Sequence, residues 1–205
     1  VLTACRLVSL ESESFDSWAG PRWGDSSLFP NGVAERPLLC APIKPSTGLS
    51  LEEHVSRALQ AARGGADIVK DDELCYDTTY NPLGARAKKI VEGLERISNE
   101  DGVPRTYVAN VIGARDSLSE RIVKAADAGA RAFMVAPGLM GLDVVREART
   151  IVGDSGLIFC HTSFSTLTNR VPRWGMSLAV YCYLQRAIGA DVLLNRFSEL
   201  APACR

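Results

Sequence analysis

The sequence lacks the features that mark several large classes of protein. It has no apolar run of the roughly 18 residues that a membrane span requires, so we expect no membrane contact. Its 23 Lys and Arg residues are balanced by 24 Asp and Glu residues, which argues against a broad basic face for nucleic acid. Residues 1–6 show no basic stretch leading into an apolar one, so no secretory signal is expected.

Cysteine is present, but not in a pattern that suggests a disulfide framework. The 6 cysteines are widely spaced, and no two of them form a C-x-x-C pair. Several lie in apolar runs such as 38–41 and 158–160. We therefore interpret them as reduced core thiols of a cytoplasmic protein.

What the sequence does contain is a regular alternation of two kinds of segment. After residue 35, short apolar runs of strand length alternate with longer segments of helical periodicity. Strands are predicted at 38–43, 66–69, 106–110, 132–136, 157–161 and 191–194. Helices are predicted at 51–63, 83–97, 118–128, 142–151 and 176–188.

The joins between these segments indicate serial βα units. Ser50 and Glu53 have the spacing of a capping box at the start of the first helix. Joins of the form Gly-Ala-x lead from helix to strand at 65–67, 129–131 and 189–191. Apolar strands connected by crossover helices predict a parallel sheet covered by helices.

Two architectures satisfy this pattern, an open doubly wound α/β sheet and a closed (β/α)8 TIM barrel. Neither G-x-G-x-x-G after the first strand nor G-x-x-x-x-G-K-[ST] occurs, and this favours the barrel. Because only about six βα units can be counted against the eight of a barrel, residues 36–205 are predicted to be a partial catalytic barrel domain without its C-terminal units. Residues 1–35 are polar and turn-rich, and are predicted to lead into the barrel.

Chemistry in a parallel α/β fold gathers at the carboxyl edge, where strands end and loops begin. The predicted strands end in several polar residues, which we expect to converge on that edge. They are Lys44, the run Lys70-Asp71-Asp72-Glu73, Asn110 and His161.

The run from Lys70 to Glu73 is the most informative of these. Mg²⁺ prefers oxygen ligands, and the carboxylates of Asp72 and Glu73 could supply them. Lys70 would repel a cation, so either it forms a salt bridge with a carboxylate or its charge has been removed. A solvated cluster of charges after a strand is the alternative interpretation.

The other edge residues have a functional and a structural interpretation each. Lys44 precedes Pro45 at a half-buried position, where a lysine can have a depressed pKa and act as a general acid or base, unless it is an ordinary surface lysine. His161 could carry a proton, donate to a substrate or be structural. Asn110 could simply cap a loop, and His54 is expected on the surface of an amphipathic helix.

Two segments are distinctive enough to indicate a family. Ile43-Lys-Pro-Ser-Thr-Gly-Leu-Ser50 and Gly64-Gly-Ala-Asp-Ile-Val-Lys-Asp-Asp-Glu73 resemble the large subunit of RuBisCO, and more closely the RuBisCO-like proteins. Gly20-Pro-Arg-Trp-Gly24 is similar to that family's approach to the barrel. The resemblance implies a (β/α)8 TIM barrel of the RuBisCO large-subunit type, whose N-terminal domain is not visible in this chain.

The resemblance also implies a role for each edge residue. The lysine that matches Lys70 is carbamylated by CO₂, which turns a cation into an oxygen ligand, so that Lys70, Asp72 and Glu73 would bind Mg²⁺ together. Lys44 would act in proton transfer during enolisation, and His161 would lie near substrate hydroxyls. The candidate catalytic residues are therefore Lys44, Lys70 and His161, and the candidate substrate-binding residues are Lys44, Asn110 and His161.

Three departures from the family pattern bear on the reaction. Ser46 and Thr162 stand where a true carboxylase has a lysine and an arginine. The family also has a further histidine at about the position where this chain has Leu194. Those groups serve the substrate phosphates and the carboxylation steps. Their replacement predicts that bisphosphate carboxylation is lost, while the metal motif and Lys44 predict that enolisation is kept.

The sequence thus predicts a Mg²⁺-dependent RuBisCO-like enzyme that enolises a keto sugar or sugar-acid derivative, as an isomerase or a decarboxylating lyase. The resemblance implies a homodimer or larger homo-oligomer, because active sites of the family form between two subunits. Two alternatives stay open. One is an inactive relative or fragment with a binding or assembly role, and the other is an unrelated metal-assisted aldolase on the same barrel.

Overall fold

The computed structural model describes residues 19–23, 36–163 and 177–195. Its strands are β1 (Cys40–Pro42), β2 (Ile68–Lys70), β3 (Thr106–Asn110), β4 (Ala132–Val135), β5 (Leu157–His161) and β6 (Val192–Leu194). Its helices are α2 (Leu51–Arg63), α3 (Leu83–Asp101), α4 (Leu118–Asp127), α5 (Pro137–Met140), α6 (Val144–Val152) and α7 (Leu178–Ala187), with a 3-10 turn η2 (Arg115–Ser117).

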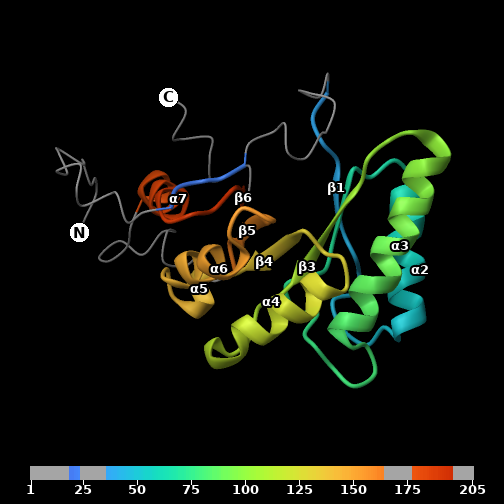
Figure 1. The fold of residues 1–205 in the computed structure, drawn as a ribbon, viewed down its shortest axis with the longest axis horizontal. Helices are drawn as coiled ribbons and strands as arrows, with labels where there is room; N and C mark the ends of the chain where they lie inside the picture. The colour runs from blue at the N-terminus through green and yellow to red at the C-terminus, as the bar shows by residue number, and fades with distance from the viewer. Residues whose placement is uncertain (1–18, 24–35, 164–176, 196–205) are drawn as a thin grey trace.

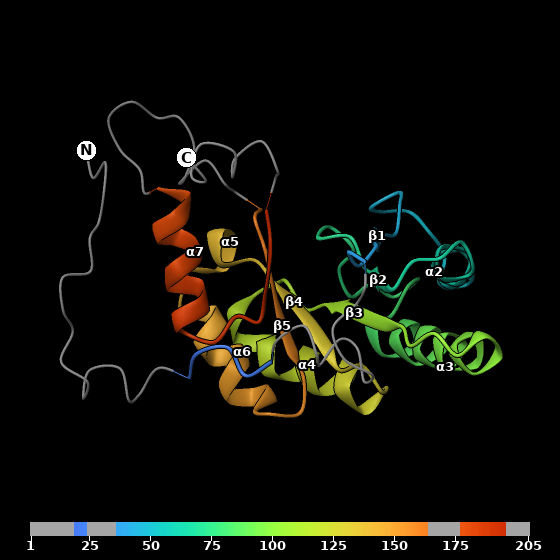
Figure 2. The ribbon, with the colours of Figure 1, turned by 90° about the horizontal axis from the view of Figure 1, so that it is seen from above.

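The strands form one parallel sheet in the order β1-β2-β3-β4-β5-β6, which is the order of the chain. Figure 1 shows the helices following the strands in sequence, and Figure 2 shows α2 and α3 at one end of this arc and α7 at the other. The sheet with its helices forms an open half-barrel of the (β/α)8 type. The predicted fold class is therefore confirmed, with six parallel strands among the described residues.

The core lies between the sheet and its helices. Every residue of β2 and of β4 is buried, as expected for parallel strands covered on both faces. Phe133 of β4 and Phe159 of β5 are fully buried on neighbouring strands. Burying a side chain of this size contributes about 1.5–3 kcal/mol, so the strand runs that predicted the fold also hold it together.

The predicted joins adopt the geometry that their residues favour. The Ser50 hydroxyl accepts a hydrogen bond from the Glu53 backbone N–H, and the Glu53 carboxylate accepts one from the Ser50 N–H, which completes the capping box of α2. The glycines of the three Gly-Ala-x joins, Gly65, Gly129 and Gly189, have φ of 99°, 96° and 126°. Side chains disfavour this left-handed region, which explains glycine at each join.

Two of these joins also carry a buried aspartate that ties neighbouring segments together. Asp67 accepts hydrogen bonds from the Leu39 N–H and from the Arg36 guanidinium. Asp191 accepts from the Ile158 N–H and from the backbone of residues 22 and 23. The described part of the predicted lead-in segment therefore packs against the turn between α7 and β6, while 1–18 and 24–35 lie outside the described residues.

Two expectations from composition can be checked on the described residues. No helix there has the length and apolar character needed to cross a bilayer. The described cysteines, Cys40, Cys75, Cys160 and Cys182, are all free thiols.

Candidate active site

The polar residues at the strand ends meet on one edge of the half-barrel. Lys70 is the last residue of β2, and its side chain is 7% exposed. Its Nζ donates to the Asp71 carbonyl at 2.9 Å and lies 3.8 Å from a carboxylate oxygen of Glu73. Desolvation lowers the pKa of Lys70, although the nearby carboxylates oppose this. A buried amine whose pKa is lowered is neutral for a larger fraction of the time than an exposed lysine, and the neutral form is the one that reacts with CO₂.

His161 joins this group from the end of β5. Its Nε2 lies 3.4 Å from the Glu73 carboxylate, and its Nδ1 accepts hydrogen bonds from the backbone N–H and the hydroxyl of Ser163, at 3.0 and 2.7 Å. Because Nδ1 is an acceptor, the hydrogen of a neutral ring sits on Nε2 and points toward Glu73. Burial lowers the pKa of His161, with the Glu73 charge acting in the opposite direction.

Lys44 and Asp72 form a second pair on the same edge. The Lys44 ammonium donates to the Asp72 carboxylate and, at 3.3 Å, to the Ser46 hydroxyl. The hydrogen bond to Asp72 raises the pKa of Lys44, whose side chain is 57% exposed. The expectation of a half-buried Lys44 with a depressed pKa is therefore wrong, because an exposed ammonium beside a carboxylate is stabilised in its charged form.

Asn110 is buried at the end of β3 and makes all its side-chain hydrogen bonds with the protein backbone. Its amide nitrogen donates to the carbonyls of Glu73 and Cys75, at 3.1 Å each, and its oxygen accepts from the Ile112 N–H at 3.1 Å. The side chain therefore holds the loop that carries Glu73. Direct contact of Asn110 with a substrate stays a prediction.

Asp71 lies at the centre of a buried hydrogen-bond network that the sequence did not reveal. Its fully buried carboxylate accepts hydrogen bonds from the Tyr107 hydroxyl at 2.7 Å, the Arg86 Nε at 3.1 Å and the Asn110 N–H at 3.1 Å. His54 Nε2 lies 3.0 Å from it. This network fixes the backbone between Lys70 and Asp72, so Asp71 sets the direction of its neighbours.

His54 is 1% exposed, so the expectation of a surface histidine is wrong. The buried positions of α2 are His54, Ala58 and Ala62, which recur every four residues on one helix face. That spacing was the available signal. It indicated a buried position, whereas the polarity of the side chain suggested a surface one.

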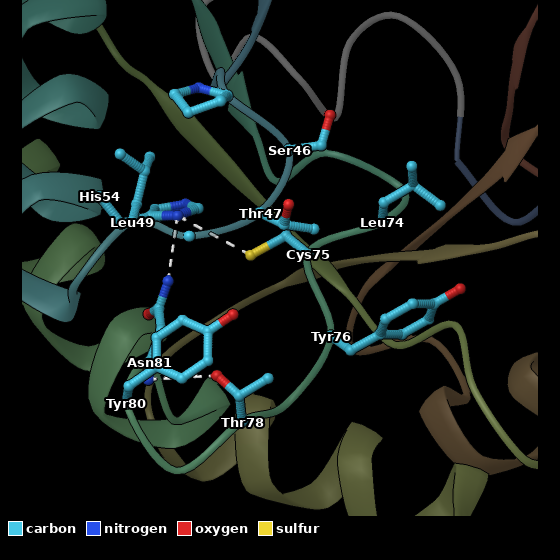
Figure 3. Close-up of a pocket in the computed structure, with 12 residues that line it drawn as sticks. Ser46, Thr47, Leu49, His54, Leu74, Cys75, Tyr76, Thr78, Tyr80 and Asn81 are labelled. Atoms are coloured by element: carbon cyan, nitrogen blue, oxygen red, sulfur yellow. Dashed lines mark hydrogen bonds between the residues drawn. The ribbon is translucent and has the colours of Figure 1, made fainter.

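Beside the edge lies a cavity of about 80 Å³ between the β1–α2 and β2–α3 loops. Figure 3 shows His54, Cys75 and Asn81 facing one another in its wall. Burial, with help from the Asp71 charge, raises the pKa of Cys75 to about 11. The thiol is therefore protonated at neutral pH and is not a ready nucleophile.

The donor set at the edge suits a hard divalent cation. Asp72 and Glu73 offer carboxylate oxygens, and Lys70 approaches Glu73 from the adjoining strand end. Burial alone would raise the pKa of Asp72, but its hydrogen bonds from Lys44 and the Leu74 N–H lower it, so this carboxylate is ionised at neutral pH. If Lys70 carried a carbamate, the edge would present three anionic oxygen groups, which fit Mg²⁺.

The chain is similar to known proteins in both sequence and fold. The catalytic domain of the ribulose bisphosphate carboxylase large chain, as a family model, matches residues 31–196. The ribulose bisphosphate carboxylase-like protein of Allochromatium vinosum is 34% identical over 85% of this chain and 38% of that relative.

Two solved structures extend the comparison to the fold. The octameric ribulose-1,5-bisphosphate carboxylase/oxygenase from Pyrococcus horikoshii has a TM-score of 0.84 at 25% identity, over 95% of this chain and 48% of that one. A rubisco-like protein (MtnW) from Alicyclobacillus acidocaldarius has a TM-score of 0.78 at 29% identity, over 89% of this chain and 47% of that one. This chain spans less than half the length of each of these relatives.

Proposed function

The chain belongs to the family of the ribulose bisphosphate carboxylase large chain, and on that premise we propose that it carries the metal-binding edge of a RuBisCO-like enzyme. The enzyme would enolise a keto sugar or sugar-acid derivative. The observation that supports this most is the meeting of Lys70, Glu73 and His161 at one edge, with the Lys44–Asp72 pair beside them.

The proposed cofactor is Mg²⁺ held by Asp72, Glu73 and a carbamate on Lys70. In forming the carbamate, the neutral Lys70 amine bonds to the carbon of CO₂ and releases one proton to solvent. Bound there, the cation would act as a Lewis acid toward the substrate carbonyl. The buried position of Lys70 supports this role, because burial favours the reactive neutral amine.

The remaining roles fall to side chains with a hydrogen to give or take. Lys44 would take the proton from the carbon next to the carbonyl as a neutral amine, once its ammonium has left Asp72 and given one proton to solvent. His161 donates its Nε2 hydrogen to a substrate oxygen, since Nδ1 is held by Ser163. Asn110 positions the loop that carries Glu73. Together with Lys44 and His161, it would also bind the substrate.

The step after enolisation is proposed to be isomerisation or decarboxylation and not carboxylation of a bisphosphate. Ser46 accepts a hydrogen bond from Lys44 and has no charge to offer a phosphate. Thr162 follows His161 and is uncharged as well. A substrate with one phosphate or none suits this edge better than a bisphosphate does.

We further propose a homodimer or larger homo-oligomer in the cytoplasm, acting on a small sugar-derived substrate without nucleic acid or membrane. Support for assembly comes from the octameric relative of known structure. Support for a reducing compartment comes from the free thiols of the described residues.

Protection of Lys70 from an amine-modifying reagent tests the proposed metal site. Mg²⁺ with bicarbonate should protect Lys70 in the wild-type protein and should fail to do so in Glu73→Gln, whereas Lys89, an exposed lysine paired with Glu52, should react equally in all samples. Peptide mass spectrometry reads both lysines at once. Absence of protection in the wild-type protein would sink the metal-enolase proposal and leave the binding or assembly role.

Solvent deuterium exchange into a keto sugar phosphate tests the chemistry itself. Exchange at the carbon next to the carbonyl should require Mg²⁺ and should fall at least about a hundredfold in Lys44→Met, the usual scale for loss of a general acid or base. Borohydride trapping of a substrate on Lys44 would instead favour the aldolase alternative.

A further inference from the structure

A second cluster of metal-ligating side chains lies behind the proposed active site. His54, Asp71 and Cys75 are all buried, and one ligand atom from each lies within 4.8 Å of the other two. They come from α2, from the end of β2 and from the β2–α3 loop. None of the proposed catalytic steps uses His54 or Cys75.

The hydrogen bonds of His54 leave one ring nitrogen aimed at the cysteine. Nε2 lies 3.0 Å from the Asp71 carboxylate, so the ring hydrogen belongs on Nε2 and the lone pair on Nδ1. Nδ1 in turn lies 3.8 Å from Cys75 Sγ and 3.3 Å from the amide nitrogen of Asn81 (Figure 3). A carboxylate that orients a histidine through its distal nitrogen is a recurrent feature of metal sites.

The nitrogen-to-sulfur spacing matches a shared metal ion. Tetrahedral zinc has bonds of about 2.0–2.1 Å to nitrogen and about 2.3 Å to sulfur, which places the two ligand atoms about 3.6 Å apart. The observed separation of 3.8 Å requires only a small adjustment. The pair is also soft, whereas the Asp72 and Glu73 carboxylates are hard ligands, so the two sites select different ions.

The adjoining cavity provides room for the remaining ligands. Its volume of about 80 Å³ exceeds the roughly 30 Å³ that one water molecule occupies in the liquid. His54 and Cys75 both line it, together with the hydroxyl side chains of Thr47, Thr78 and Tyr80. Two waters can therefore complete a four-coordinate ion.

We propose that His54 Nδ1 and Cys75 Sγ bind a thiophilic divalent metal ion, such as Zn²⁺, with Asp71 orienting the histidine. On binding, the Cys75 thiol releases its proton to solvent, and the metal replaces the Asn81 amide hydrogen at Nδ1. Because Arg86 already neutralises the charge of Asp71, this carboxylate does not balance the charge of the metal ion. The Cys75 thiolate that forms on binding offsets part of that charge. The ion links α2 to the loop that carries Glu73.

Titration with Co²⁺ tests this site apart from the proposed Mg²⁺ site, because only a thiolate ligand gives a sulfur-to-cobalt charge-transfer band. We expect the band to grow to one equivalent in the wild-type protein and in Glu73→Gln. It should persist in Cys40→Ser, the matched control, since Cys40 lies on β1 and does not line the cavity. It should be lost in Cys75→Ser and be weakened at least tenfold in apparent affinity in His54→Gln.

Two outcomes would overturn the proposal: no band in the wild-type protein, or a band that survives Cys75→Ser. If either variant fails to fold, X-ray absorption on the zinc-loaded wild-type protein decides. One sulfur and one imidazole nitrogen in the coordination shell support the site, and an all-oxygen shell refutes it. Because Glu73→Gln retains this site, failure here leaves the enolase proposal standing.

Discussion

The two lysines of the edge are chemically different because of what surrounds each of them. Lys70 is enclosed by β-strand residues and by Met134, whose sulfur lies 3.7 Å from Nζ, so its ammonium is poorly hydrated. Lys44 sits in solvent against the Asp72 carboxylate. The sequence shows only that both lysines lie at strand ends, so it does not tell which of the two is buried. This is why a depressed pKa was an open interpretation for Lys44. How deeply each lysine is buried decides the direction of its pKa shift, and that burial depends on the residues packed around it.

This contrast predicts the order in which the two lysines titrate in metal-free, CO₂-depleted buffer. Desolvation lowers the pKa of Lys70, and the hydrogen bond to Asp72 raises the pKa of Lys44, so Lys70 should lose its proton first as the pH rises. Nuclear magnetic resonance of ¹³C-labelled lysine side chains measures both. Glu73→Gln should lower the pKa of Lys70 further, since the Glu73 charge stabilises the ammonium. The reverse order would contradict this account of the edge.

Removing the charge of Asp71 should cause a large loss of folding stability. Asp71→Asn removes the charge that neutralises the fully buried Arg86, which should cost about 3–5 kcal/mol in urea denaturation. Glu100→Gln, which breaks the exposed pair with Arg63, should cost less than about 1 kcal/mol. Similar losses in the two variants would show that Asp71 is not the organising charge.

The same carboxylate has a defined pH dependence. Burial by itself raises the pKa of Asp71, but Arg86 and His54 lower it more, so the folded value lies below the ordinary carboxyl range. Its contribution to stability is therefore present above that range and is lost as the pH falls through the folded value. The gap between wild type and Asp71→Asn should narrow in acid. A gap that widens in acid would contradict the direction of the shift.

At the scale of elements, periodicity and glycine placement predicted most of the fold. The bounds of β3, β5 and α2 match the prediction, because their apolar pattern ends sharply at polar or glycine residues. Helix α5 was not predicted, since Pro137–Met140 is one turn and too short to show a period. Strand β1 is shorter than the predicted 38–43, because only Cys40–Pro42 pair in register with β2, although Leu39 and Ile43 still share backbone hydrogen bonds with residues 67–70.

Two glycines with positive φ should differ in how much stability the protein loses when each is replaced by alanine. Gly189 has φ of 126°, and a Cβ there would lie 2.9 Å from the Arg149 Cβ, so Gly189→Ala combines backbone strain with a clash. Gly102, at the end of α3, has φ of 73° and no atom within 4 Å of the added Cβ. We expect a loss of about 1 kcal/mol for Gly102→Ala and at least about 2–3 kcal/mol for Gly189→Ala in chemical denaturation. Equal losses would mean that the clash is relieved by movement of Arg149.

At the scale of the whole molecule, topology explains why the edge residues were predictable and the network behind them was not. Parallel strands all end on one side, so any polar residue that follows a strand is brought to the same edge. Lys70, Glu73 and His161 could thus be grouped from the sequence alone. The contacts of Asp71 with His54 and Arg86 depend on how α2 and α3 pack against β2, and no local pattern records that packing.

Assembly of copies should bury an apolar surface beside the edge. Leu74, Tyr76 and Tyr80 of the β2–α3 loop are 47%, 42% and 54% exposed, next to the residues that the proposed function places at the substrate. Large apolar side chains gathered beside a site are typical of an interface. If two copies share this surface, the double variant Tyr76→Ser with Tyr80→Ser should raise the dissociation constant of the oligomer at least tenfold.

Sedimentation equilibrium measures that constant, and the matched control is Tyr183→Ser, which removes a 50% exposed tyrosine from α7 instead. The control should assemble as the wild-type protein does, because α7 lies at the opposite end of the half-barrel from α2 and α3 (Figure 2). Equal weakening in both variants, or none in either, would place the contact surface elsewhere. Since the loop also carries Glu73, loss of assembly should reduce Mg²⁺-dependent protection of Lys70, and unchanged protection would separate assembly from the metal edge.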